Sequence, residues 1–250
     1  MELEQLQLER GLFTFPSLTA GEKVIHAITT RPFWDKPFDK RAMLERAAEV
    51  LGLEPRLIAC GRQVHGTKLV YVVSDEFKQR GYVEFPDTDA LTTTEPNILL
   101  ATFTADCLPA LIADAATPRI AVVHAGWRGT LSRILAKTIL RLRELGSNPA
   151  ELSVWLGPAI SQANYETSPE LADRFRAEFP QCPEAIDGRL LDLARLNAHQ
   201  AQEAGVDASR IHAAGVCTFA DGAHCESYRR DGADSGRMAT VMMLKAAANV

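Results

Sequence analysis

The hydrophobic pattern of this chain alternates short apolar runs with polar turns, and most runs have the length of a strand. Strands are predicted at residues 10–15, 24–30, 69–73 and 152–156. Two further runs, Ile98–Phe103 and Ile120–Val123, are almost entirely apolar and predict buried strands.

Helical periodicity occupies several stretches between these runs. Met43, Leu44, Ala47 and Val50 recur at helical spacing, so we predict a helix from Asp39 to Leu51. Further helices are predicted from Thr130 as N-cap to about Leu145, at 169–179 and 190–204, and as a closing apolar segment at 237–248. Strands interspersed with helices indicate the α/β class.

Composition and charge narrow the functional classes. The chain has 250 residues, of which 46% are hydrophobic and 24% charged, which is typical of a globular protein. No linker, repeat or low-complexity run divides it, so we expect one domain over residues 1–250. The net charge of -5 lacks the basic footprint of a nucleic-acid binder.

The termini and cysteines predict a cytoplasmic location. The first residues are acidic and lack the pattern of a signal peptide, and no apolar run approaches the roughly 20 residues that span a bilayer. The five cysteines form no CxxC pair and fit reduced thiols better than a disulfide framework.

Two segments carry the strongest candidate chemistry. In Thr104–Pro109 and Val122–Thr130, an apolar run ends and is followed by Cys107 and His124, respectively. These side chains could form a nucleophile and its base, or two ligands of one metal; alternatively both are structural core residues. His65, next to Gly66, is the best-placed third imidazole.

Other polar segments give weaker candidates. Asp87 and Asp89 fit a solvated loop edge better than acid–base work. Arg128 could hold an anion beside free helix amides, and Tyr165 could line a pocket. Arg229, in a loop with a second arginine, suits phosphate or carboxylate recognition.

Taken together, several segments resemble the YfiH family, also called the laccase-domain, polyphenol oxidase or peptidoglycan-editing-factor family. The matching segments are Arg62–Gly66, Thr104–Pro109, His124–Gly129, Gly157–Ile160, Cys217–Thr218, Ser227–Asp231 and Gly236–Ala239. They run in the family's order and cover most of the chain from about residue 58.

The resemblance implies a single α/β domain of mixed sheet layers flanked by helices. It also implies a metal and catalytic site at His65, Cys107 and His124, with zinc the usual ion. Family members are described as phosphorylases of adenosine, inosine and methylthioadenosine, and as adenosine deaminases. One departure is that Cys225 and Glu226 occupy places where the family often has two aromatic residues.

Two imidazoles and a thiolate suit zinc with an open fourth position, at which water can be activated for deamination. Phosphorolysis needs in addition an anchored phosphate. The candidate substrate-binding residues are Arg62, Gln63, Asp106, Arg128, Tyr165 and Arg229. We expect a purine nucleoside and phosphate as partners, no nucleic acid or membrane, and a monomer or weak homo-oligomer.

Three other functions fit the same residues. Copper is the alternative metal, because two histidines and one cysteine also bind copper in proteins. With copper, the protein would be a polyphenol oxidase. The six histidines of the chain are few for a multicopper enzyme. A metal-free Cys107–His124 pair would make a cysteine hydrolase or amidase that edits peptidoglycan precursors. The fourth reading is a non-enzymatic binding module.

Overall fold

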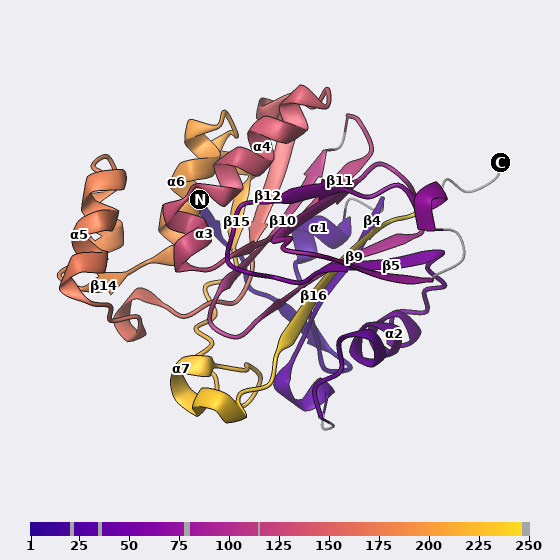
Figure 1. The fold of residues 1–250 in the computed structure, drawn as a ribbon, viewed down its shortest axis with the longest axis horizontal. Coiled ribbons are helices and arrows are strands. Elements are labelled where there is room, and N and C mark those ends of the chain that lie inside the picture. The colour runs from indigo at the N-terminus through magenta and orange to yellow at the C-terminus, as the bar shows by residue number, and fades with distance from the viewer. Residues whose placement is uncertain (21–22, 35–36, 78–80, 115, 247–250) are drawn as a thin grey trace.

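Two mixed sheets of seven strands each lie face to face in the computed structural model (Figure 1). The structure describes residues 1–20, 23–34, 37–77, 81–114 and 116–246. In spatial order, the first sheet contains β1 (Glu2–Leu3), β15 (Ile211–Ala213), β12 (Leu152–Leu156), β10 (Leu108–Asp114), β11 (Arg119–Ala125), β8 (Ala90–Thr93) and β6 (Leu69–Tyr71).

The second sheet contains, in order, β2 (Gln7–Glu9), β3 (Leu12–Thr14), β4 (Val24–Thr29), β16 (Met238–Leu244), β9 (Ile98–Thr104), β5 (Leu57–Gly61) and β7 (Tyr82–Phe85). A separate hairpin pairs β13 (Ile186–Asp187) with β14 (Leu190–Leu191). The helices are α1 (Pro16–Ala20), α2 (Lys40–Val50), α3 (Trp127–Leu131), α4 (Ile134–Glu144), α5 (Pro169–Glu178), α6 (Leu193–Glu203) and α7 (Tyr228–Asp231). Among the described helices, none has the length and apolar character that a bilayer span requires.

Strand alternation divides the core into layers. In β9, Leu100 points into the core between the sheets, whereas Leu99 packs on the side covered by α2. In β11, Val122 points between the sheets and Val123 packs toward α4 and α6. Because neighbouring side chains point to opposite faces of a strand, both faces of each central strand are buried.

Three parallel strands of the second sheet cross directly into three parallel strands of the first. β5, β7 and β9 run parallel to one another and lead into β6, β8 and β10, respectively. The carboxyl ends of the first three therefore meet the amino ends of the second three at one edge of the sandwich. The three crossover segments, 62–68, 86–89 and 105–107, lie together there.

The crossovers pack too closely for a side chain at Gly61. A Cβ built on Gly61 would lie 2.1 Å from the carbonyl oxygen of Thr88, and the Thr88 amide donates to the Arg62 carbonyl at 3.1 Å. Glycine at this position allows the first two crossovers to touch backbone to backbone.

The predicted α/β class, with mixed sheet layers flanked by helices, is confirmed, as are the strands near residues 12–14, 24–29, 98–104, 119–125 and 152–156 and the helix beginning after Asp39. The single domain over residues 1–250 stays a prediction.

One helix prediction is wrong, and two predicted helices begin later than expected. The segment predicted as a helix from 237 to 248 is strand β16 up to Leu244, and its residues 247–248 lie outside the described part of the chain. Its continuous apolar run fits a strand hydrogen-bonded on both sides by β4 and β9. The helix after Thr130 breaks at Arg133, whose φ is 61°, and Thr130 lies inside α3 instead of capping a helix. Leu190 lies in β14, before α6 begins at Leu193.

His26 is a structural residue of the core. Its Nε2 atom accepts a hydrogen bond from the Phe15 amide at 2.8 Å inside the core. Burial lowers the pKa of His26 to about 4, because the desolvated ring resists protonation.

We predict that His26 makes the protein less stable below neutral pH. The unfolded state takes up this proton near the ordinary pKa of 6.5, and the folded state only near 4. The free energy of unfolding should therefore fall by up to about 3 kcal/mol as the pH drops through this window, and be fully retained above it. His26→Gln should flatten the slope in denaturant unfolding between pH 4 and 7; an unchanged slope would contradict the assignment.

Candidate metal centre

His65, Cys107 and His124 meet at the edge where the crossovers gather. His65 lies in the crossover from β5 to β6, Cys107 in that from β9 to β10, and His124 near the end of β11. Their ligand atoms all lie within 4.8 Å of one another, and they form the one group of this kind found among the described residues. The structure thus brings together the three side chains that the sequence singled out.

The spacing fits a metal ion. The Cys107 Sγ atom lies 3.8 Å from Nε2 of His65, and the rings of His65 and His124 meet edge to face with centroids 4.7 Å apart. Ligands of a tetrahedral zinc ion lie about 3.3–3.8 Å from one another, given bonds of about 2.0–2.3 Å. Two imidazole nitrogens and a sulfur at this spacing are a donor set that zinc or copper accepts.

Asp89 fixes the orientation of this set from behind. Its carboxylate accepts from Nδ1 of His124 at 2.8 Å and from the backbone amides of His65 and Gly66 at 3.0 and 2.8 Å. With Nδ1 engaged, Nε2 is the nitrogen of His124 that remains for an ion. Burial would raise the pKa of Asp89, but the bonds to His124 and to the amides of Gly66 and Val64 outweigh it and lower the pKa.

The placement of Asp89 corrects one prediction. The sequence favoured a solvated loop edge for Asp87 and Asp89. Asp87 is indeed exposed, whereas Asp89 is buried and holds two of the candidate ligands. Residues two apart can face opposite environments here because Asp87 has a left-handed φ of 52°, which breaks the extended alternation.

Gly126 leaves the space that the sulfur and the imidazole occupy. A Cβ at this position would lie 2.8 Å from Cys107 Sγ and 2.7 Å from Cδ2 of His65. His65 and Asp106 themselves adopt left-handed φ angles of 59° and 83°. Such backbone costs of order 1 kcal/mol or more for a non-glycine residue, and it concentrates at functional sites.

Cys107 and His124 shift each other's titration. Burial would raise the pKa of the Cys107 thiol, but the charge and hydrogen bonds of His124 and His65 outweigh it and lower the pKa to about 6. Burial would likewise lower the pKa of His124, but Cys107 and Asp89 raise it to about 9. The neighbouring imidazoles therefore favour the thiolate of Cys107, the form that binds metals and acts as a nucleophile.

A cavity of about 590 Å³ opens onto this centre. Its lining contains the three candidate ligands together with Phe38, Lys40, Arg62, Gln63, Phe103, Thr104, Ala105, Asp106, Trp127, Ile160, Tyr165, Tyr228, Arg229 and Arg237. Five of the six predicted substrate-binding residues are among them. Arg128 is not: it is exposed, and its guanidinium carbon lies 4.9 Å from the ring centroid of Trp127.

Several of the predicted binding residues already have protein partners. The side-chain amide of Gln63 donates to the Phe103 carbonyl at 2.7 Å and accepts from the Phe103 backbone amide at 2.8 Å. The Asp106 carboxylate accepts from the Thr218 hydroxyl at 2.7 Å and from the Arg229 amide at 2.6 Å. These contacts tie the crossover at Cys107 to the loop before β16, so both side chains shape the wall of the cavity.

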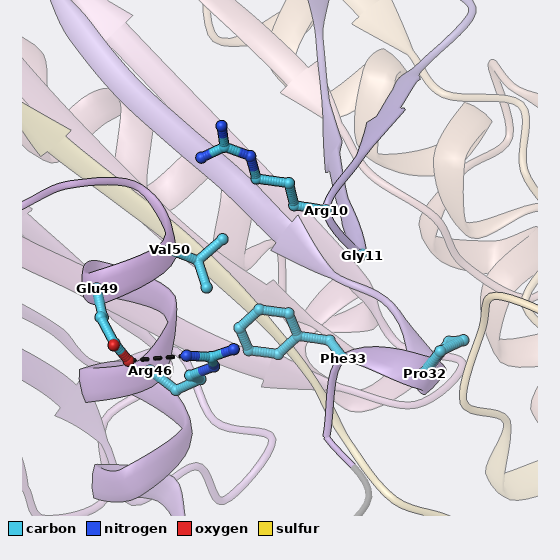
Figure 2. Close-up of a pocket in the computed structure, with 7 residues that line it drawn as sticks. All are labelled: Arg10, Gly11, Pro32, Phe33, Arg46, Glu49 and Val50. Atoms are coloured by element: carbon cyan, nitrogen blue, oxygen red, sulfur yellow. Dashed lines mark hydrogen bonds and ion pairs between the residues drawn. The ribbon is translucent and has the colours of Figure 1, made fainter.

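A second cavity of similar volume, about 580 Å³, lies between α2 and the turn of the β2–β3 hairpin (Figure 2). Arg10, Gly11, Pro32, Phe33, Arg46, Glu49 and Val50 line it. None of these seven described residues is a histidine or cysteine, whereas all three candidate ligands line the first cavity.

Comparison with known proteins identifies the family of the chain. A family model described as multi-copper polyphenol oxidoreductase laccase matches residues 32–245. The chain belongs to this family.

Curated relatives of the chain carry a different kind of name. A "purine nucleoside phosphorylase" of Deinococcus radiodurans is 35% identical over 238 residues, covering 88% of this chain and 89% of the relative. A Bacteroides thetaiotaomicron protein of the same name is 34% identical and covers 94% and 97%.

Solved structures in the YfiH group share the fold. YlmD from Geobacillus stearothermophilus superposes with a TM-score of 0.84 at 27% identity, covering 97% of this chain and all of that one. The YfiH protein of Bacillus licheniformis gives a TM-score of 0.85 at 24% identity, covering 96% and 99%. The sequence resemblance to YfiH is confirmed.

The cavity has aromatic walls although Cys225 and Glu226 stand where the resemblance leads us to expect two aromatic residues. Cys225 is fully buried in the core between the sheets, and Glu226 accepts a hydrogen bond from the Gly236 amide at 3.1 Å. Aromatic rings reach the cavity from five other positions: Phe38, Phe103, Trp127, Tyr165 and Tyr228. Of these five, only Tyr165 is among the substrate-binding residues predicted from the sequence. Trp127 and Tyr228 lay inside the matching segments, whereas nothing in the sequence marked Phe38.

We predict that Asp89→Asn weakens metal binding about 10- to 100-fold, because an amide nitrogen cannot accept the bonds that now orient His65 and His124. Competition with a chromophoric chelator measures the affinity. Asp87→Asn, two residues away and exposed, is the matched control and should bind metal like the wild type. Equal metal affinities of the Asp89→Asn and Asp87→Asn variants would contradict a role of Asp89 in orienting the candidate ligands.

Proposed function

We propose that this protein is a zinc-dependent purine nucleoside phosphorylase that acts on adenosine, inosine and methylthioadenosine and also deaminates adenosine. The relatives named purine nucleoside phosphorylase, 34–35% identical over most of both chains, support the substrate class. The proposal includes a cytoplasmic location and a monomer or weak homo-oligomer.

The observation that carries the proposal is the composition of the cavity at the centre. Four cationic side chains, Lys40, Arg62, Arg229 and Arg237, line it together with five aromatic rings. Among the described residues of this lining, the one carboxylate, on Asp106, accepts hydrogen bonds at both oxygens. A phosphate and a flat base are the kinds of group that cations and aromatic faces bind.

His65, Cys107 and His124 would hold the zinc ion. Zinc in such a site supplies Lewis acidity and activates water near neutral pH, which is the chemistry that deamination requires. For phosphorolysis, the cations would anchor phosphate beside the anomeric carbon while the aromatic rings hold the base. The glycosidic C–N bond breaks and a C–O bond to phosphate forms, while the proton that the hydrogen phosphate loses ends on the departing base.

We predict that the purified enzyme converts adenosine with phosphate into adenine and ribose 1-phosphate, and produces some inosine when phosphate is omitted. Chromatography of the products measures both. Stoichiometric zinc should accompany the activity, and Cys107→Ala should lose both zinc and activity, because two imidazoles alone leave the site short of a ligand. Stoichiometric copper with turnover of phenols, but not of nucleosides, would favour the oxidase instead.

One observation favours a second function, that of a cysteine hydrolase or amidase. Cys107, His124 and Asp89 form a chain in which a carboxylate orients an imidazole beside a sulfur atom. That order is the arrangement of a nucleophile, its base and an orienting acid.

Chelation and alkylation separate the two functions. For the zinc enzyme, we predict that a strong chelator abolishes turnover and that added zinc restores it. For a cysteine hydrolase, the chelated protein would keep cleaving amide substrates, whereas iodoacetamide would inactivate it. Full activity after verified removal of the metal would contradict the zinc proposal.

A further inference from the structure

Four cations line the cavity, but they differ in the partners that they already have. We propose that Arg237 is the residue that binds the phosphate co-substrate. The inference rests on the proposed function, in that it assumes a cavity that takes free phosphate.

Lys40 and Arg62 have carboxylate partners. The Lys40 ammonium lies 2.5 Å from Glu84 Oε1 and also donates to the Gly61 carbonyl. The Arg62 guanidinium pairs with Asp87 at 2.9 Å, and both side chains are about 60% exposed. A phosphate would have to compete with a carboxylate for each of these cations, and at Arg62 with water as well.

Arg229 supports the wall of the cavity. Its Nη1 and Nη2 atoms donate to the carbonyls of Asn164 and Glu166 at 3.3 and 3.0 Å, and its guanidinium carbon lies 5.4 Å from the Tyr165 ring centroid. Both terminal nitrogens thus hold the 164–166 segment in place.

Arg237 is held in another way. Its Nη1 atom donates to the carbonyls of Ser235 and Gly236 at 2.9 and 2.6 Å, which fixes the half-buried side chain. Within the described part of the chain, Nε and Nη2 make no hydrogen bond or ion pair. That edge of a guanidinium presents two parallel N–H groups, the shape that matches two oxygens of a phosphate.

The backbone places Arg237 next to the metal centre. Met238, the following residue, pairs with Thr104 at the end of β9, three residues before Cys107. Gly236, on the other side, donates to the buried carboxylate of Glu226. A phosphate on Arg237 would therefore lie against the crossover that carries Cys107.

Neighbouring acids do not neutralise Arg237. Glu226 and Asp234 line a smaller cavity of about 270 Å³ that shares Arg237 with the main one. No ion pair joins either acid to Arg237 among the described residues, and one Glu226 oxygen is engaged by the Gly236 amide. The positive charge thus remains available to an anion.

The test is direct binding of radiolabelled phosphate to the metal-loaded protein by equilibrium dialysis, without nucleoside. Arg237→Met should weaken binding at least about tenfold, and Arg237→Lys, which keeps the charge but loses the fork, by a smaller factor. Arg46→Met, in the second cavity (Figure 2), is the matched control and should bind like the wild type. In turnover, Arg237→Lys should raise the KM for phosphate and leave the KM for the nucleoside unchanged.

The outcomes separate the inference from the proposed function. Wild-type protein that binds no phosphate, or Arg237 variants that bind it as the wild type does, would overturn the inference. Binding that depends on Arg237 without formation of ribose 1-phosphate would support the inference and overturn the phosphorylase. If Arg237→Met does not fold, as judged by circular dichroism, the lysine variant decides the question in the same assays.

Discussion

The buried carboxylate of Asp89 is the contact on which this site depends. It stands in one crossover, accepts from the backbone amides of His65 and Gly66 in another, and receives the ring N–H of His124 from β11. Its own carbonyl accepts from the His124 amide at 2.8 Å. A buried charge is tolerated when every lone pair has a donor. Asp89 thus joins three segments that are distant in sequence: it orients the imidazole of His124 and fixes the backbone that carries His65.

The sandwich explains why these segments meet. Parallel strands of one sheet lead straight into parallel strands of the other, so that three crossovers share one edge, and the loop before β16 returns to it. The candidate ligands come from the crossovers and from β11. Tyr228 and Arg229 come from α7, and Arg237 from the residues that lead into β16. The strands and their crossovers thus fix the positions of the three candidate ligands, while α7 and the residues before β16 complete the wall of the cavity.

The sequence singled out the three candidate ligands that the fold brings together, but not the residue that supports them. Cys107 and His124 are recognisable in the sequence because each comes at the end of an apolar run, which is a local signal. The burial of Asp89 was not, because its partners lie 23 to 35 residues away and a DTD run usually marks a solvated turn. Likewise, the apolar sequence of β16 is compatible with a helix or a strand. It forms a strand because β4 and β9 provide hydrogen-bond partners on both sides. The sequence also could not show that Arg237 has a guanidinium edge without a partner among the described residues, because this depends on where the fold places the Ser235 and Gly236 carbonyls.

The description of the family model refers to copper, whereas the names of the curated relatives refer to a phosphorylase. The contacts of the remaining histidines help to decide between a multicopper oxidase and a phosphorylase. A multicopper enzyme needs several imidazole clusters. Here His26 accepts from Phe15, while His199, His212 and His224 lie beside Glu203, Glu4 and Asp221, respectively. Within the described chain, no second group of metal-binding side chains forms. A single three-ligand centre under a cationic, aromatic cavity suits chemistry on one bound substrate better than electron transfer between several metal ions.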